Sequence, residues 1–274
     1  MLTSYDIPKK LHLYWGKNDN LSKLHYKTVT SFLKHNPDWE VIIWFDSNYS
    51  NKKTWATPEQ KINYTGENYF PNLFNLKSVS VQDISSVGIK FSTDLPEVKK
   101  SDIFRYFILY HMGGVYSDFD ILYLRSLNNI LEKFESVKQD KLLITFNTDY
   151  FNIAFIGANK GNAFYKKIYS ACAEQPDIND YQAYGTKLVL KLYPTLENVK
   201  EFFPNMEIVN LNNDLIYPFA WNETEKIFLE DKSFQINKDC IGIHWFNGSD
   251  LAKKYLNNSN QLCTISKIME QNNL

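Results

Sequence analysis

The sequence predicts an α/β fold, chiefly because of the order of elements in its first fifty residues. Residues 11–15 are rich in β-formers and predict a strand that ends at Gly16. Ser22 can cap a helix that runs to about His35 and carries an apolar stripe. Residues 39–45 then form a continuous apolar strand. Such a strand–helix–strand unit is typical of a parallel sheet, whose ligands bind beyond the carboxyl ends of its strands.

A second helix is predicted from Ser101, a favourable N-cap, to Gly113, which would end it. Its apolar face consists of Ile103, Phe104, Phe107, Ile108 and Met112. The spacing of three and four residues places on the opposite face Asp102, Arg105, Tyr106 and Leu109.

The rest of the chain continues this alternation, and we expect one domain over residues 1–274. Residues 49–95 are polar, aromatic and irregular, and they predict an insertion over one sheet edge. The later elements that we expect are strands at residues 142–146, 153–158, 206–211 and 239–246, helices from about Asn162 and Gly185, and a short helix after a loop in residues 247–256.

Composition and charge argue against several classes of protein. The 274 residues are 44% hydrophobic, and the formal net charge of −1 gives no global field that would attract nucleic acid. The first residues lack the apolar run of a signal peptide, and no segment approaches the ~20 apolar residues of a membrane span. We therefore expect a cytoplasmic protein without a transmembrane segment. Its cysteines, Cys172, Cys240 and Cys263, have no metal-like spacing and predict reduced core thiols.

The most unusual segment is GGVYSDFDILYL, residues 113–124, which places Asp118 and Asp120 in an otherwise apolar strand. With period two, both acids fall on one face together with Tyr116 and Leu122. Two carboxylates on one face repel each other and lose hydration. A bound divalent cation would relieve this, but solvation or pairing with lysine at a strand end would also do so. The D-x-D pattern alone leaves both interpretations open.

The whole block SDIFRYFILYHMGGVYSDFD, residues 101–120, resembles the sugar-transferase family defined by a D-x-D region. This family includes fungal initiating mannosyltransferases, bacterial capsule-type transferases and large clostridial glucosylating toxins (glycosyltransferase family 32 and relatives). Its shared block, S-D-x-x-R-Y followed by apolar residues and G-G-x-Y-x-D-x-D, is matched at every position. Three flanking segments are similar to family patterns: residues 7–19, 36–47 and 241–250.

The resemblance implies a GT-A-type, Rossmann-like mixed sheet flanked by helices. It also implies a metal-dependent, retaining glycosyltransferase of polysaccharide or glycan biosynthesis. Such an enzyme moves a hexose from a UDP- or GDP-sugar to a glycan or another hydroxyl acceptor, with Mn²⁺ or Mg²⁺ as cofactor. Residues 49–95 would then lie on the acceptor side.

The resemblance also assigns roles to residues. Asp120 would bind the metal directly, Asp118 would bind the metal or ribose, and His244 would be a further ligand. The catalytic set would be Asp102, Arg105 and Asp120, with the first two binding sugar hydroxyls and phosphate. The other donor-binding residues would be Trp15, which stacks on the nucleobase, Asn48, Tyr116, Asn152, Ser249 and Lys253.

The terminal pattern departs from the family. Trp245, Phe246 and Asp250 stand where the family has histidine, tryptophan and tryptophan. A sugar-nucleotide or glycan-binding module that has lost turnover is therefore an alternative. An aspartyl-phosphate phosphatase also uses D-x-D after an apolar strand. There, however, the pair lies in the first strand, and Thr or Val takes the place of Leu122.

Overall fold

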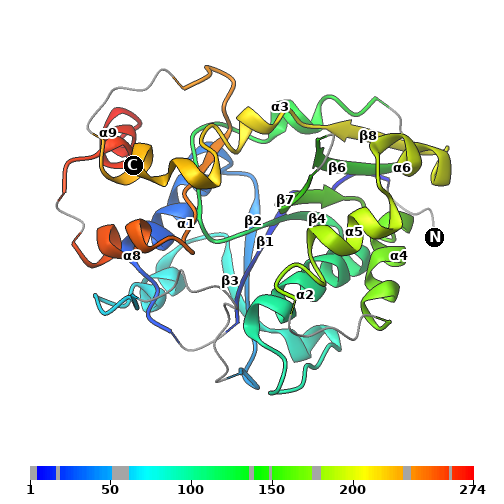
Figure 1. Ribbon diagram of the computed structural model, residues 1–274, viewed down its shortest axis with the longest axis horizontal. Helices are drawn as coiled ribbons and strands as arrows, with labels where there is room; N and C mark the ends of the chain where they lie inside the picture. The colour runs from blue at the N-terminus through cyan, green and yellow to red at the C-terminus, as the bar shows by residue number, and fades with distance from the viewer. Residues whose placement is uncertain are drawn as a thin grey trace.

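A mixed seven-stranded sheet with helices on both faces forms the centre of the computed structural model (Figure 1). The structure describes residues 5–16, 19–50, 62–135, 139–147, 150–174, 180–230, 236–258 and 261–274. The predicted α/β class, a mixed sheet flanked by helices, is confirmed. Within the described residues, no helix is both long enough and apolar enough to cross a bilayer.

The large sheet is parallel in its N-terminal half and mixed beyond it. In spatial order its strands are β3 (Val79–Asp83), β2 (Glu40–Phe45), β1 (Lys10–Gly16), β4 (Gly114–Ser117), β7 (Phe151–Ala158), β6 (Asp140–Phe146) and β8 (Met206–Asn210). Strands β1 and β2 pair in parallel, as the strand–helix–strand pattern predicts, and β4 pairs in parallel with β1. Strand β7 runs antiparallel to both β4 and β6. A second, two-stranded sheet pairs β5 (Ile121–Tyr123) with β9 (Gly242–His244).

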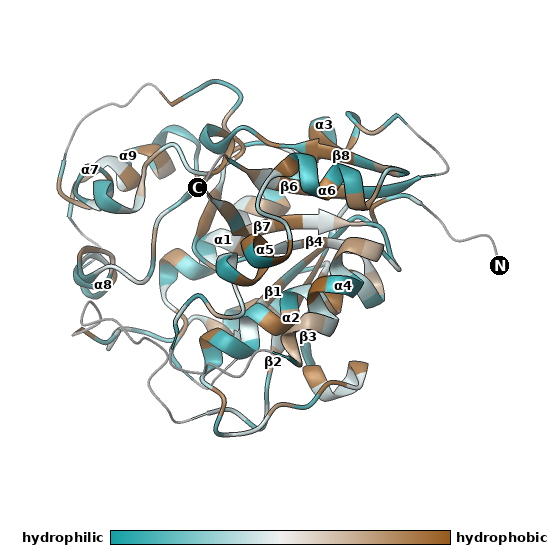
Figure 2. Cartoon of the chain, turned by 45° about the vertical axis from the view of Figure 1, so that its right-hand side comes forward, coloured by the Kyte–Doolittle hydropathy of each residue, from teal (hydrophilic) through white to brown (hydrophobic). Residues whose placement is uncertain are grey.

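Three hydrophobic clusters hold the layers together. The helices are α1 (Lys23–His35), α2 (Glu97–Met112), α3 (Asn128–Leu131), α4 (Ala163–Cys172), α5 (Thr186–Leu192), α6 (Leu196–Phe202), α7 (Thr224–Phe228), α8 (Asp250–Asn257) and α9 (Thr264–Gln271). One cluster joins α2, α4 and α5 to one sheet face, and a second joins α1 to the other. The third surrounds β9 with α7, α8 and α9. In Figure 2 the central strands are largely brown, whereas the outer helices also carry teal residues.

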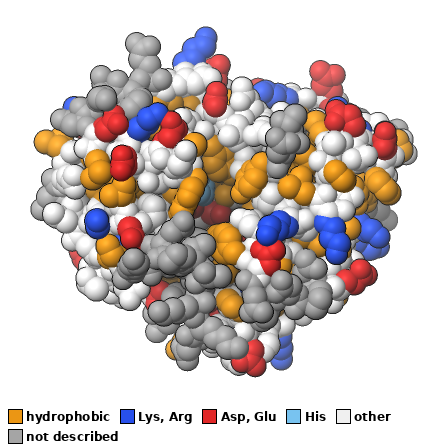
Figure 3. Space-filling model, in the orientation of Figure 1, with side chains coloured by type: hydrophobic (Ala, Val, Ile, Leu, Met, Phe, Trp, Pro, Cys, Tyr) orange, Lys and Arg blue, Asp and Glu red, His pale blue; other side chains and the backbone are white. Residues whose placement is uncertain are grey.

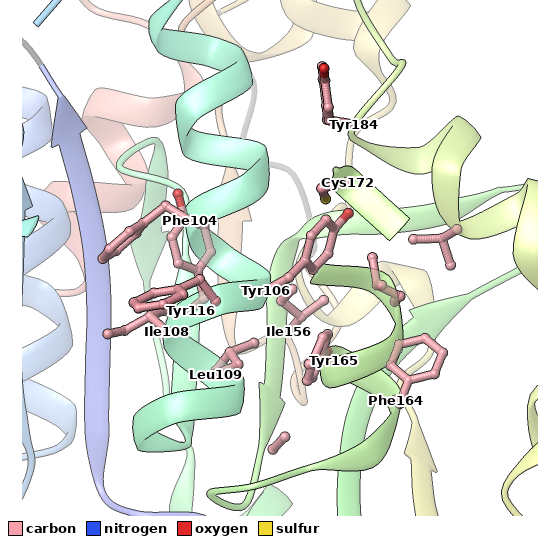
Figure 4. Packing of buried hydrophobic residues seen from close by; sticks show 14 of the residues in the cluster. Phe104, Tyr106, Ile108, Leu109, Tyr116, Ile156, Phe164, Tyr165, Cys172 and Tyr184 are labelled. Atoms are coloured by element: carbon pink, nitrogen blue, oxygen red, sulfur yellow. The ribbon is translucent and has the colours of Figure 1, made fainter. Parts of the chain in front are cut away.

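Helix α2 is the central helix of the molecule, and it begins earlier than predicted. Pro96 occupies the N-cap position, so the prediction of Ser101 as N-cap is wrong. Apolar side chains cover both sides of α2, as Figure 4 shows: Phe104 lies beside Tyr116, and Tyr106 lies beside Tyr165. The rings of Tyr106 and Tyr165 stack with their centroids 6.1 Å apart. Asp102 and Arg105, one turn into the helix, are therefore buried in the protein rather than on an outer face.

Several elements do not appear in the sequence-based prediction. Residues 79–83 form β3, an edge strand parallel to β2, inside the segment that we expected to be irregular. The 3₁₀ turns η1 (Phe70–Asn75) and η2 (Ile84–Val87) flank it, while residues 51–61 lie outside the described residues. Helices α6, α7 and α9 are also new. The predicted free, buried state of the three cysteines is confirmed.

Gly113 connects α2 to β4 in a conformation that requires glycine. Its φ of 69° with ψ of −173° lies in a region that other residues almost never adopt. A Cβ at this position would also lie 2.5 Å from the backbone nitrogen of Lys160. The glycine therefore fixes the direction in which β4 leaves the helix.

We expect Gly113→Ala to lower the free energy of unfolding by about 2–3 kcal/mol, because strain and backbone overlap add. The matched control is Gly88→Ala, whose left-handed φ of 83° faces open space. Strain alone should cost that variant about 1 kcal/mol. Urea unfolding of both variants measures the difference. Equal losses would contradict the proposed overlap at Gly113.

Candidate active site

A cavity of about 1370 Å³ opens beyond the carboxyl ends of β1 and β4. Figure 3 shows it as a hollow in the middle of one face, with acidic and histidine side chains inside and hydrophobic side chains around its rim. This cavity is larger than a typical small-molecule pocket, and it has room for two ligands. The position agrees with the rule for ligands of parallel sheets.

Asp118 and Asp120 lie where the chain passes from one sheet to the other. Strand β4 ends at Ser117, and the chain turns over residues 118–120 before β5 begins. The predicted continuous strand with both acids on one face is therefore wrong. The backbone N–H of Asp118 donates to the large sheet at Ala154, at 2.8 Å, whereas the carbonyl of Asp120 accepts from Trp245, at 2.9 Å.

Arg105 compensates the charge of Asp118. Its guanidinium lies 3.2 Å from the carboxylate of Asp118 and 2.8 Å from that of Asp102, and it donates to the carbonyl of Ile153 at 2.7 Å. The ring of Tyr116 covers it at 4.7 Å from the centroid. Burial lowers the pKa of Arg105, but Asp118 and its neighbours outweigh this and raise it. Burial raises the pKa of Asp102 to about 6.

His244 and a backbone amide hold the second acid. Nε2 of His244 lies 3.1 Å from Oδ1 of Asp120, and the N–H of Asn247 donates to Oδ2 at 2.8 Å. Burial favours the neutral form of Asp120, but the interactions with His244 prevail and lower its pKa to about 2. Burial likewise lowers the pKa of His244, and Asp120 outweighs this and raises it. The partners of the two acids are thus an arginine and a histidine, not a lysine.

The strained backbone of Phe246 positions this amide. Its φ of 53° is left-handed, which is uncommon for a bulky residue and costs about 1–3 kcal/mol. Its carbonyl accepts from the N–H of Ser249 at 2.9 Å, and its ring packs edge-to-face on His244 at 4.5 Å. These contacts hold the turn that directs the next N–H, that of Asn247, toward Asp120.

The three residues Asp118, Asp120 and His244 fit a divalent cation. Each offers one ligand atom, and these atoms lie within 4.8 Å of one another. With Asp102 and Arg105 included, three carboxylates face one guanidinium, so the group carries a net charge of −2 while His244 is neutral. Two carboxylate oxygens and an imidazole nitrogen are suitable ligands for Mn²⁺ or Mg²⁺. Nδ1 of His244 is buried and has no hydrogen-bond partner within the described part of the chain.

The structure brings most of the predicted site residues to this cavity. Its walls include Trp15, Asp102, Arg105, Asp118, Asp120, Asn152, His244 and Lys253. The indole of Trp15 packs edge-to-face on Phe119 at 5.2 Å and donates to the carbonyl of Asp19 at 3.1 Å. Nζ of Lys253 donates to the side chain of Asn247 at 2.6 Å, which links α8 to the loop that holds Asp120.

Three predicted donor-binding residues do not line the cavity. The side chain of Asn48 donates to the carbonyl of Phe91 at 2.9 Å. Tyr116 is buried behind Arg105, where its hydroxyl bonds to that of Ser101 at 2.8 Å. Ser249 caps α8 by accepting from the N–H of Ala252 at 3.1 Å. In the structure these side chains support neighbouring elements.

The cavity also contains residues that the sequence patterns do not indicate. Tyr150, Tyr217, Trp221 and Phe246 form part of its wall, and Asn247 acts through its backbone. The run YPFAW, residues 217–221, belongs to no motif that we identified. Its density of aromatics next to a proline is the one signal that could have indicated a surface site.

Comparison with known proteins finds a family model that matches part of this chain. Residues 22–138 match the family described as "Glycosyltransferase sugar-binding region containing DXD motif". The chain is 29% identical over 150 residues to inositol phosphoceramide mannosyltransferase 1 of Schizosaccharomyces pombe, a match over 53% of this chain and 38% of that protein. It is 26% identical over 133 residues to a toxin of Photorhabdus asymbiotica, a match over 45% of this chain and 4% of the toxin. The chain thus spans well under half of either relative.

Among solved structures, the PaToxG glycosyltransferase is similar at 18% identity, with a TM-score of 0.48 and coverage of 72% of this chain and 73% of that one. The segment that matches the family model, residues 22–138, contains α1, α2 and the Asp118–Asp120 turn. The resemblance visible in the sequence is confirmed by this match, since residues 22–138 are similar to the sugar-binding region of the DXD-containing glycosyltransferases.

Proposed function

We propose that this protein is a metal-dependent, retaining glycosyltransferase of the GT-A type in polysaccharide or glycan biosynthesis. It would move a hexose from a UDP- or GDP-sugar to a hydroxyl of a glycan or another acceptor. The observation that carries the proposal is the cluster of Asp118, Asp120 and His244 inside a cavity large enough for donor and acceptor. The matched family and the mannosyltransferase relative support it.

Each wall of the cavity suits one part of a sugar nucleotide. Asp118, Asp120 and His244 would hold the divalent cation, which when bound supplies positive charge against the diphosphate. Trp15 offers an aromatic surface to the nucleobase. Lys253, on the loop side of the same cavity, offers a second positive charge.

Asp102 and Arg105 suit the sugar end. Both line the cavity, are nearly fully buried and are held to each other at 2.8 Å, so they are rigid partners for hydroxyl groups. Asn152, whose side chain donates to Asn213 at 2.6 Å, offers a further amide at the start of β7. No carboxylate of the site stands out as a covalent nucleophile, because Asp102 is ion-paired with Arg105 and because Asp118 and Asp120 would hold the cation.

A front-face route is therefore our preferred chemistry. The bond between the anomeric carbon and the phosphate oxygen breaks, and the acceptor oxygen forms its bond to that carbon on the same face. The acceptor proton moves to an oxygen of the leaving diphosphate. The products are the glycosylated acceptor, with unchanged anomeric configuration, and the nucleoside diphosphate.

A donor panel tests the function. We expect one or more UDP- or GDP-hexoses to yield nucleoside diphosphate with Mn²⁺ present, and chelation by EDTA to stop the release. NMR of the transferred sugar reports the anomeric configuration. Tight metal-dependent binding of nucleotide without turnover would favour the binding module. Release of phosphate from simple esters would favour the phosphatase.

A further inference from the structure

The far wall of the cavity carries a row of aromatic side chains that leads away from the acidic cluster. Starting at His244, the ring of Phe246 lies 4.5 Å away edge-to-face, and the indole of Trp221 lies 5.7 Å beyond it. Tyr217 also packs against His244, with the ring centroids 5.2 Å apart. Trp221, Phe246 and Tyr217, together with Tyr150, which also lines the cavity, are called the aromatic wall below.

Two members of the aromatic wall are exposed although they are large. Trp221 is 44% accessible and Tyr150 is 45% accessible, and both line the cavity. Trp221 is nevertheless held firmly. It begins the 3₁₀ turn η4 (Trp221–Glu223), in which Glu223 accepts from the N–H of Ala220 at 2.9 Å and pairs with Lys226. An exposed indole on a fixed support is ready to contact a ligand.

The hydroxyl of Tyr217 provides a second, independent indication of a ligand. Its side chain is nine-tenths buried and lines the cavity, yet the oxygen has no hydrogen-bond partner in the described part of the structure. A buried donor without a partner is costly unless a ligand or water completes it.

Polar and charged groups around the aromatic wall select the chemistry of the occupant. Asn147, Asn213 and two acids, Asp214 and Glu223, also line the cavity, and Lys226 pairs with Glu223. An anionic molecule would be repelled there. A purely apolar one would remove water from the carboxylate of Asp214 and the side chain of Asn147 without replacing the lost contacts. A neutral polyhydroxy compound meets both requirements, because a sugar ring has apolar C–H faces and hydroxyl edges.

We propose that the aromatic wall is the acceptor subsite and that it holds an uncharged sugar, with Trp221 stacked on the ring and Tyr217 bonded to a hydroxyl. This inference rests on the proposed glycosyltransferase function. Trp15 and Lys253, which suit the donor, come from the end of β1 and from α8, whereas the aromatic wall comes from other segments, mainly residues 217–221 and 246. Both groups of residues line the cavity that contains the acidic cluster.

The test compares release of nucleoside diphosphate with and without sugar acceptors. The probes are the methyl glycosides of glucose, galactose and mannose, the disaccharides maltose, lactose and cellobiose, and glucuronic acid as the anionic counterpart. We expect at least one neutral sugar to raise release above the acceptor-free rate, with glucuronic acid at least about tenfold less effective. No response to any neutral sugar, or a stronger response to glucuronic acid, overturns the inference.

Substitution of Trp221 then tests whether the stimulation by neutral sugars depends on the aromatic wall. Trp221→Ala should raise the acceptor KM about tenfold and leave acceptor-free donor hydrolysis and the donor KM unchanged, while Trp221→Phe should restore most of the affinity. Phe202→Ala, an exposed aromatic on α6 outside the cavity lining, is the matched control. Equal loss of hydrolysis and transfer in Trp221→Ala contradicts the acceptor role. No release from any donor, with or without acceptor, refutes the transferase function instead.

Discussion

Asp120→Asn is expected to lower metal-dependent turnover of the sugar nucleotide about a thousandfold. The replacement keeps the shape of the side chain but removes the charge that, together with Asp118, would hold the cation. Asparagine can still accept from the N–H of Asn247, so the loop should remain in place. Initial rates of nucleoside diphosphate release over a range of Mn²⁺ concentrations measure the effect, and thermal unfolding verifies that the variant is folded.

The control is an acid outside the cavity. Asp38 pairs with Lys9 at 2.5 Å and is well exposed, and Asp38→Asn should leave the rate unchanged. A rate for Asp120→Asn within tenfold of wild type would remove Asp120 from the catalytic set. Full recovery at higher Mn²⁺ would instead show that the residue acts only through metal affinity.

Lys100→Met is expected to lower the free energy of unfolding by about 3–5 kcal/mol. Lys100 is fully buried, and its ammonium group contacts Asp46 at 2.7 Å, Glu97 at 3.0 Å and the carbonyl of Asn48 at 2.8 Å. Methionine fills the space but leaves two buried carboxylates without a cation. Glu97 also accepts from the hydroxyl of Tyr14 at 2.9 Å. The substitution should therefore also weaken the packing of Tyr14 near the end of β1.

Urea unfolding of two further variants supports or refutes this explanation. Lys10→Met removes a lysine from a partly exposed pair with Glu40 and should cost less than about 1 kcal/mol. The triple variant Lys100→Met, Glu97→Gln, Asp46→Asn removes the unpaired charges and should regain part of the stability. If the triple variant is no more stable than Lys100→Met alone, packing rather than charge explains the loss.

Local signals predicted the first part of the fold well. The cap at Ser22 and the apolar strand at residues 39–45 are properties of short segments, and the structure has α1 and β2 in these places. The acids were harder to place, because alternation of polarity over residues 115–122 looks the same whether one strand continues or two strands belong to different sheets. What separates β4 from β5 is their partners, β7 and β9, which lie far along the chain.

The candidate site likewise contains residues that the sequence indicated and residues that only the folded chain brings together. Asp102, Arg105, Asp118 and Asp120 lie within twenty residues and form a pattern, so the sequence indicated them. Tyr217 approaches His244, and Trp221 approaches Phe246, only after the chain folds back, and no sequence spacing predicts such contacts. Asn48 shows the opposite case. The sequence suggested it as a donor-binding residue because it follows a strand end, but its side chain donates to the carbonyl of Phe91 and does not line the cavity.

The passage of the chain between two sheets at residues 118–120 has a mechanical consequence. Asp118 is hydrogen-bonded to the large sheet, whereas Asp120 is hydrogen-bonded to the segment that continues into α8. A ligand shared by both carboxylates would connect that segment to the large sheet. Its binding free energy would add to the free energy of locally unfolding the segment. Occupancy of the site and integrity of the C-terminal quarter of the protein would then rise and fall together.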